Sequence, residues 1–176
     1  MNDFIDRLVI CPKGIAGWKT FEDLCIEVFC YLFVPPLHQP IIQARSYSGI
    51  DRRDAVFPNR NFGVSNNWGY LLQELNARMV LFEFKNYDKS DIGKDEVIQT
   101  QSYMKEPMGR LAIIVGNDFP NEAAHIKRNT IYSQEKKVIL FLTKSHLKEM
   151  LLIKERGEDP SDLIIHLIEA FCLQHE

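Results

Sequence analysis

The segment Met79–Tyr87, with the sequence MVLFEFKNY, is predicted to form a β-strand because aromatic and aliphatic residues dominate it. Side chains alternate between the two faces of a strand, so Glu83 and Lys85 project from one face, roughly 7 Å apart. Burying a carboxylate and an ammonium group without partners costs several kcal/mol. One interpretation is therefore a solvent-exposed face that carries a weak ion pair. Leu81 and Tyr87 share that face, however, and their apolar character favours a partly buried functional site.

Helices and further strands are predicted on both sides of this segment. A first helix is expected to begin at Thr20, with Asp23 at capping-box spacing, and to end at the proline pair 35–36. The remaining patterns predict strands at 41–45, 53–57, 111–117 and 137–143, and helices at 66–78, 95–105, 122–134 and, on either side of a turn at 157–160, in the last part of the chain. Strands that alternate with helices in the second half predict an α/β three-layer sandwich, with a central mixed β-sheet flanked by helices.

The chain is expected to form a single domain, with a core at about 20–143 and C-terminal helices at 144–176. Its 176 residues are 45% hydrophobic and 26% charged, which is typical of globular domains and excludes disordered, collagen-like and coiled-coil proteins. The formal charge of -3 also excludes a protein that coats nucleic acid by charge alone. It does not exclude an enzyme that contacts nucleic acid at one small site.

The N-terminal sequence MNDFIDRLVI has acidic residues where a signal peptide has positive charge, and it lacks a long apolar core. The longest apolar run near the start, 28–36, is far shorter than the roughly 20 residues that a membrane helix needs. We therefore expect a cytoplasmic protein with no membrane partner.

Asp54 is the second candidate site residue, because it opens the predicted strand DAVF. It alternates with Val56, so it points toward the interior if Val56 does. An acidic residue at the start of a strand can also bind the backbone of its own turn, which is the role expected of the neighbouring Asp51. If Asp54 lies on a strand beside Glu83 and Lys85, the cluster can hold Mg²⁺, which prefers carboxylate oxygens completed by water and phosphate.

Two helical residues are further candidates. Glu22 lies in the first turn of its predicted helix, where the helix dipole favours an acid. Its angular position is between Phe29 and Phe33, at the edge of the apolar stripe, which favours a site over solvent. Gln99 and Tyr103 are four residues apart on the helix after the central strand, so they share one face of it. The alternative to a role in the site is an exposed amide and a packed ring.

A basic cluster surrounds the two aspartates and consists of Arg45, Arg52, Arg53 and Arg60. These side chains would lie where the phosphate backbone of a nucleic acid passes a site at Asp54. A solvated basic loop explains the cluster equally well.

Several of these segments together resemble the PD-(D/E)xK nuclease superfamily, which has the restriction-endonuclease-like fold. In chain order they are a helix with Phe-Glu, then GIDRRDAVF, FEFKN, a Q-x-x-x-Y pair and GRLAIIV, and they extend over roughly residues 20 to 143. The resemblance departs from the family pattern at Arg53, which stands where a proline often precedes the first aspartate. Asp51 also competes with Asp54 for that assignment.

The resemblance implies a role for each matching residue. Asp54 and Glu83 would bind the metal, and Lys85 would orient or activate the attacking water and stabilise negative charge. Glu22 is similar to the additional helix acid of many members, as a further metal ligand, and Gln99 to the polar helix residue of some branches. Mg²⁺ or Mn²⁺ would be the cofactor.

The expected function is a metal-dependent endonuclease that hydrolyses phosphodiester bonds of DNA, with a role in restriction or defence that rests on family analogy alone. Sequence specificity would come from loops, a homodimer or a larger nuclease complex. The alternatives are an RNA-directed nuclease and a non-catalytic module that binds nucleic acid or protein and keeps the nuclease fold.

Overall fold

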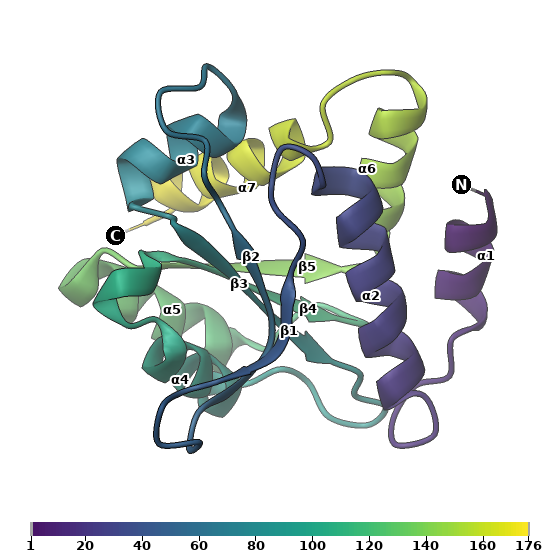
Figure 1. The fold of residues 1–176 in the computed structure, drawn as a ribbon. Helices are drawn as coiled ribbons and strands as arrows, with labels where there is room; N and C mark the ends of the chain where they lie inside the picture. The colour runs from purple at the N-terminus through teal and green to yellow at the C-terminus, as the bar shows by residue number, and fades with distance from the viewer. Residues whose placement is uncertain (1, 176) are drawn as a thin grey trace.

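A five-stranded mixed β-sheet forms the centre of the protein in the computed structural model, which describes residues 2–175 (Figure 1). The strands are β1 (Ile41–Arg45), β2 (Arg52–Pro58), β3 (Met79–Lys85), β4 (Leu111–Gly116) and β5 (Val138–Thr143). They lie in the order β1-β2-β3-β4-β5. The pairs β1–β2 and β2–β3 are antiparallel, whereas β3–β4 and β4–β5 are parallel.

Helices cover both faces of this sheet, so the architecture is the expected α/β sandwich (Figure 1). They are α1 (Asn2–Ile10), α2 (Trp18–Phe33), α3 (Asn67–Leu75), α4 (Lys94–Tyr103), α5 (Glu122–Glu135), α6 (Lys144–Glu155) and α7 (Ser161–Leu173), with a 3₁₀ turn at Glu106–Met108. Helices α4 and α5 pack on one face, and α2, α3, α6 and α7 pack on the other. No helix within residues 2–175 is long and apolar enough to span a membrane.

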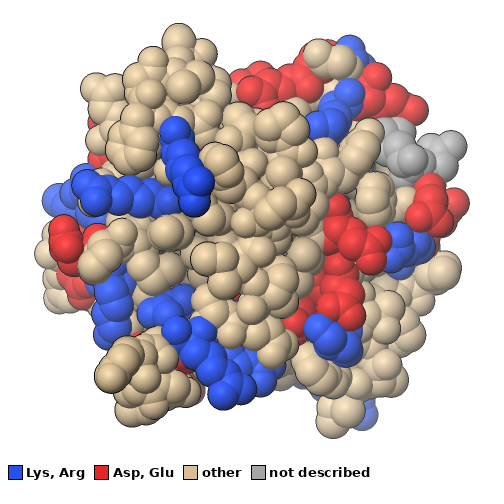
Figure 2. Space-filling model, viewed as in Figure 1, with Lys and Arg blue, Asp and Glu red and all other residues tan. Residues whose placement is uncertain are grey.

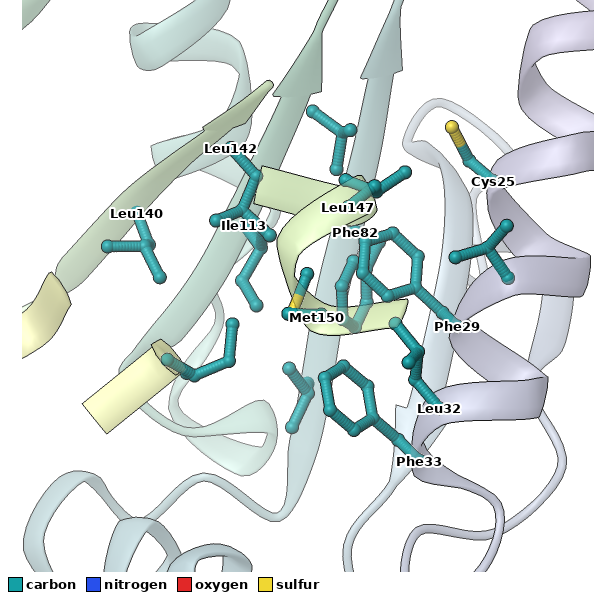
Figure 3. Packing of buried hydrophobic residues seen from close by; sticks show 14 of the residues in the cluster. Cys25, Phe29, Leu32, Phe33, Phe82, Ile113, Leu140, Leu142, Leu147 and Met150 are labelled. Atoms are coloured by element: carbon teal, nitrogen blue, oxygen red, sulfur yellow. The ribbon is translucent and has the colours of Figure 1, made fainter. Parts of the chain in front are cut away.

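The larger hydrophobic core lies between the sheet and helices α2, α6 and α7 (Figure 3). The ring of Phe29, on α2, lies 4.5 Å from the ring of Phe82, on β3, measured between centroids. Met150 on α6 and Leu140 on β5 extend the same cluster. Burial of each such side chain contributes about 1.5–3 kcal/mol to folding, so this core fixes α2 against the central strand.

The second core fills the space between the sheet and helices α4 and α5. Val56 on β2 and Leu81 on β3 contact this layer, together with Val97 of α4 and Ile131 of α5. Because strand side chains alternate, the same sheet face continues from Leu81 to Glu83 at the end of β3. The inward direction of Val56 also places Asp54 on this face, as the sequence predicted.

The structure differs from the predicted elements mainly at the N-terminal end. Helix α1 was not predicted, although it packs Leu8 into the core. Helix α2 begins at Trp18 and has Gly17 at its N-cap, with no side-chain cap. Thr20 therefore lies inside the helix, and the predicted capping box at Thr20 is wrong. The chain already turns at Gly14–Gly17, where the Gly17 N–H donates to the Gly14 carbonyl at 3.1 Å.

Candidate active site

Asp54 and Glu83 face each other at the point where β2 and β3 separate. The regular pairing of these strands runs from Pro58–Met79 to Ala55–Phe82. At the next position, the Asp54 N–H donates to Glu83 Oε1 at 3.4 Å, and the Phe84 N–H donates to Asp54 Oδ2 at 2.9 Å. Each carboxylate thus accepts a bond from the backbone of the opposite strand, in place of a carbonyl. The two carboxylates are held together at a fork in the sheet.

Lys85 completes the charged cluster on the same face. Its Nζ lies 3.5 Å from Glu83 Oε2, and its side chain is only 14% exposed. The sequence prediction that Glu83 and Lys85 lie side by side is confirmed in its geometry. Glu83 is only 2% exposed, so this face of the strand is not the solvated surface of the alternative interpretation.

Gln99 and Tyr103 reach the cluster from helix α4. Lys85 Nζ donates to Gln99 Oε1 at 3.2 Å, and Gln99 Nε2 donates to the Tyr103 hydroxyl at 3.0 Å. An ammonium group can only donate, so the amide oxygen must face Lys85. Gln99 therefore holds the ammonium group of Lys85 in place and ties it to the ring of Tyr103.

The electrostatics of the fork disfavour two free negative charges. The pKa of Glu83 is raised to about 7, mainly by burial and also by the charge of Asp54, while Lys85 opposes both effects. Burial also raises the pKa of Asp54, against the hydrogen bond from the Phe84 N–H and the charge of Lys85. Two buried carboxylates that repel each other are relieved either by a proton or by a cation. The fork is therefore suited to a cation.

Glu22 lies close to this region but has other partners. It is 4% exposed, and its Oε1 accepts from Lys19 Nζ at 3.2 Å and from Gln43 Nε2 at 3.3 Å. The prediction that Glu22 is directed to a site and not to solvent is consistent with this burial. Its carboxylate makes no hydrogen bond to Asp54 or Glu83 among the described residues.

Gln43 is a residue of the site that the sequence did not indicate. It lies on β1 between Ile42, which pairs with Ala55, and Ala44, which pairs with Arg53, so it stands opposite Asp54 in the register. Its φ is 50°, in the left-handed region that non-glycine residues rarely adopt. No sequence signal marks such a position, because glutamine has no preference for positive φ.

The metal-binding potential of the site rests on two carboxylates. Within residues 2–175, no group of three or more His, Cys, Asp and Glu side chains is arranged to hold a metal ion. The predicted trio of Asp54, Glu83 and Glu22 is thus not assembled as a single ligand set. The donors of Asp54 and Glu83 still fit Mg²⁺, which is commonly bound by one or two carboxylates, with water and phosphate oxygens in the other positions.

Asp51 closes the β1–β2 hairpin instead of joining the fork. The Ser46 N–H donates to the Asp51 carbonyl at 3.0 Å, and the Asp51 N–H donates to Ser46 Oγ at 3.1 Å. Its carboxylate lies 3.9 Å from the guanidinium of Arg53. Of the two aspartates, Asp54 is the one that contacts the strand of Glu83.

Arg53 has a structural position and not the exposed one expected of a phosphate ligand. Its Nε and Nη2 donate to the Tyr103 carbonyl at 3.4 and 3.3 Å, and the residue is 7% exposed. The guanidinium also lies 5.7 Å from the centroid of the Tyr103 ring. Arg53 therefore links β2 to the end of α4, where it supports the helix that carries Gln99.

The other three arginines of the predicted cluster are exposed but lie at two different places. Arg45 and Arg52 pair with each other at the end of the β1–β2 hairpin. Figure 2 shows Lys and Arg side chains gathered over the lower part of β1 and this hairpin, whereas acidic side chains gather over α2. Arg60 follows the opposite end of β2, so it is not beside Asp54. Of these arginines, Arg52 is the one whose charge acts on Asp54, and Arg45 is its partner on β1.

Comparisons with known proteins give one informative similarity. No model of a protein family matches the sequence, and no solved structure matches it. The chain is 31% identical over 107 residues to the "Putative transposon gamma-delta 80.3 kDa protein" of Escherichia coli (strain K12). The match covers 61% of this chain but only 15% of that relative, so the chain is similar to a small part of a much larger protein.

Proposed function

We propose that this protein is a divalent-metal-dependent endonuclease that hydrolyses phosphodiester bonds of DNA. The observation that carries the proposal is the fork between β2 and β3, where the buried carboxylates of Asp54 and Glu83 lie with the ammonium group of Lys85. The resemblance of these residues to the PD-(D/E)xK pattern supports the same chemistry. The sandwich with its mixed sheet is compatible with the restriction-endonuclease-like fold, which is part of the proposal.

In this proposal, Asp54 and Glu83 hold Mg²⁺ or Mn²⁺. When bound, the ion supplies an activated water and neutralises charge on the phosphate. Lys85 lies against Glu83 and donates to phosphoryl oxygens as negative charge develops, an electrostatic stabilisation that needs a fixed cation. Gln99 keeps that cation in place through its 3.2 Å hydrogen bond.

Substrate binding is assigned to the exposed hairpin. Arg45 and Arg52 lie near the fork and have the positive charge that contacts a phosphate backbone without reading its sequence. Glu22, whose charge acts on Asp54, can hold a water or a second cation together with Gln43. The similarity to a transposon-encoded protein is compatible with DNA as the substrate. A role in restriction or defence depends on the family resemblance.

The test is cleavage of supercoiled plasmid, linear duplex DNA, single-stranded DNA and RNA, each with Mg²⁺, Mn²⁺ or EDTA. We expect metal-dependent nicking by the wild type and none by Lys85→Ala. Lys148→Ala, which removes an exposed lysine from α6 on the other side of the sheet, is the matched control and is expected to nick normally. Equal nicking by the wild type and Lys85→Ala would show that the site is wrong.

A non-catalytic binding module with this fold is the second candidate. The observation that favours it is that, within residues 2–175, no group of three or more His, Cys, Asp and Glu side chains is arranged to hold a metal ion. Such a module binds nucleic acid but does not cleave it with any of the metals. Binding that is independent of Mg²⁺ and unchanged in Lys85→Ala identifies this case. Cleavage of RNA in preference to DNA identifies the RNA-directed nuclease.

A further inference from the structure

A groove lies directly beside Lys85, and neither Asp54 nor Glu83 is among its lining residues. It is a cavity of about 640 Å³ between two segments of the chain. One is the segment 13–18, which ends the α1–α2 connection and begins α2, and the other is the segment 84–90, which contains the end of β3. Figure 1 shows that the α1–α2 connection passes below the N-terminal end of α2, beside the chain that leaves β3. A cavity of this size accommodates a molecule of drug-like dimensions, such as a nucleotide.

The walls of this groove are held together by a hydrogen-bonded asparagine. Asn86 Nδ2 donates to the Pro12 carbonyl at 2.9 Å and to the Gly14 carbonyl at 3.3 Å. The Gly14 N–H donates back to the Asn86 carbonyl at 2.8 Å. Asn117 in turn donates to Asn86 Oδ1 at 2.7 Å. The connection to α2 is therefore fixed to the end of β3, and the groove is formed before a ligand arrives.

Two large apolar side chains line the groove and remain open to solvent. Trp18 is 48% exposed and Ile15 is 92% exposed, whereas the other tryptophan, Trp68, is 1% exposed in the core. An exposed indole next to a candidate active site is a typical stacking surface for a nucleobase, because every base has a flat π-face.

Positive charge accompanies these apolar side chains. Lys13, Lys85 and Lys89 line the groove, with Asp88 as the single acid among the lining residues. Lys13 forms an ion pair with Asp118 at 2.6 Å, on the rim. An aromatic face with lysines around it matches a nucleotide, which has a flat base and a phosphate. A protein partner that needed only Ile15 and Trp18 would not use the exposed Lys89 of the same groove.

A larger hollow elsewhere lacks this combination. It has a volume of about 1030 Å³ and lies between α3, α7 and the segment 61–66. Tyr70 contributes an exposed ring there, but none of its lining residues is Lys or Arg, and one is Glu169. The groove beside Lys85, and not the larger hollow, has the charge that phosphate requires.

We propose that the groove binds one unpaired nucleotide of the strand that enters the site, with its base stacked on Trp18 and its phosphate near Lys89. This inference rests on the proposed nuclease function and narrows the substrate to nucleic acid that is single-stranded, frayed or flipped next to the scissile bond. Inside a duplex both faces of a base are covered by its neighbours, so the base cannot reach the indole without leaving the stack.

Tryptophan fluorescence tests this proposal without requiring cleavage. The full chain is titrated in EDTA with oligo-dT, oligo-rU and a blunt duplex, and the two single-stranded arms separate DNA from RNA as the source of the nucleotide. We expect a single-stranded arm to quench the emission, because Trp18 stacks on a base while Trp68 stays buried. Trp18→Phe is expected to abolish the quenching but keep most of the affinity.

Trp18→Ala is expected to weaken single-strand binding about tenfold, the loss typical of one base–aromatic stack. Tyr70→Ala, which removes an exposed ring outside the groove, is the matched control and is expected to bind normally. Lys89→Glu is a second variant on the exposed rim and is expected to lower the affinity as well.

The outcomes separate this inference from the nuclease proposal. If Lys85-dependent cleavage occurs but neither single strand changes the Trp18 emission, the groove assignment is overturned and the nuclease stands. Tighter binding to the blunt duplex than to both single strands also overturns the groove assignment. Quenching of Trp18 without any cleavage supports the nucleotide groove and overturns the nuclease.

Discussion

Asp54 and Glu83 exchange hydrogen bonds across the fork of the sheet: the Asp54 N–H donates to the Glu83 carboxylate at 3.4 Å, and the Asp54 carboxylate accepts from the Phe84 N–H at 2.9 Å. The backbone of each strand thus positions the acid of the other. Fixed carboxylates need no reorganisation when a cation binds, which is the arrangement that a preorganised site requires. The relationship also explains why removal of either acid should affect both stability and activity.

The metal-free protein is expected to lose stability as the pH rises from about 5 to 7. Burial raises the pKa of Glu83 from 4.5 to about 7, so the folded state holds a proton there that the unfolded chain has already released. Stability falls with pH wherever the folded state binds more protons, and it becomes level above the folded pKa. The thermal midpoint measured in EDTA should fall over this window, and Glu83→Gln should flatten the profile. A wild-type midpoint that is constant or rises across it would contradict the proposed burial.

Magnesium is expected to raise the thermal midpoint more at pH 8 than at pH 5. Metal ligands must be deprotonated, so protons compete with the cation at the fork when the pH is below the pKa of Glu83. A ligand at 100 times its Kd stabilises the folded state by about 2.7 kcal/mol. Scanning fluorimetry with and without Mg²⁺ measures the shift, and Asp54→Asn should remove most of it. Equal shifts in the wild type and in Asp54→Asn would place the metal elsewhere.

Asp54→Asn and Asp51→Asn form a pair that tests which aspartate acts. Asp54 contacts the strand of Glu83, whereas the Asp51 backbone closes the hairpin and its carboxylate faces Arg53. We expect Asp54→Asn to lower the cleavage rate by a factor on the order of 10²–10³, as when one preorganised electrostatic group is removed. Asp51→Asn should stay within about tenfold of the wild type, because backbone groups make its turn. The opposite order in a plasmid-nicking assay would transfer the metal-binding role to Asp51.

Arg52 and Arg53 are neighbours with different expected effects. Arg53 is buried against the Tyr103 carbonyl, so Arg53→Ala should lower the free energy of unfolding by about 1–3 kcal/mol. Arg52 is exposed on the hairpin, so Arg52→Ala should leave the free energy of unfolding unchanged but weaken DNA binding. It should also lower the slope of log affinity against log salt concentration by about 1. Urea denaturation and a salt titration of DNA affinity separate the two effects. If Arg53→Ala is as stable as the wild type and its DNA affinity depends less on salt, Arg53 contacts phosphate after all.

The parts of the site that the sequence predicted are those governed by the strand period. Alternation alone places Glu83 beside Lys85, and places Asp54 on the face of Val56, because backbone geometry determines both. The helix period similarly turns Gln99 and Tyr103 toward one another, and they form a 3.0 Å hydrogen bond. Strand composition was sufficient to predict β1 at its observed bounds and β3 to within two residues.

The parts that the sequence did not predict depend on contacts between distant elements. Arg53 looked like a member of an exposed basic cluster, because its partner, the Tyr103 carbonyl, is 50 residues away. The hydrogen bond of Glu22 to Gln43 depends on how α2 crosses the sheet, which no local pattern specifies. Helix α1 was missed since a short amphipathic segment becomes stable only when it packs on α2 and α6.

The last prediction concerns the strained backbone of Gln43, which has a φ of 50° within β1. Left-handed backbone costs about 1–2 kcal/mol for a residue with a Cβ, whereas glycine adopts it without that cost. Glycine normally destabilises a strand relative to alanine by roughly 0.5–1 kcal/mol. At this position the order should be reversed, with Gln43→Gly as stable as Gln43→Ala or more stable, by up to about 1 kcal/mol in urea denaturation.

Both variants lose the 3.3 Å hydrogen bond to Glu22, so the comparison cancels that contact and isolates the backbone. If Gln43→Ala is clearly the more stable of the two, the strand is unstrained there. If Gln43→Gly is at least as stable as Gln43→Ala, the protein maintains local strain next to Asp54. Backbone strain of this kind clusters at functional sites.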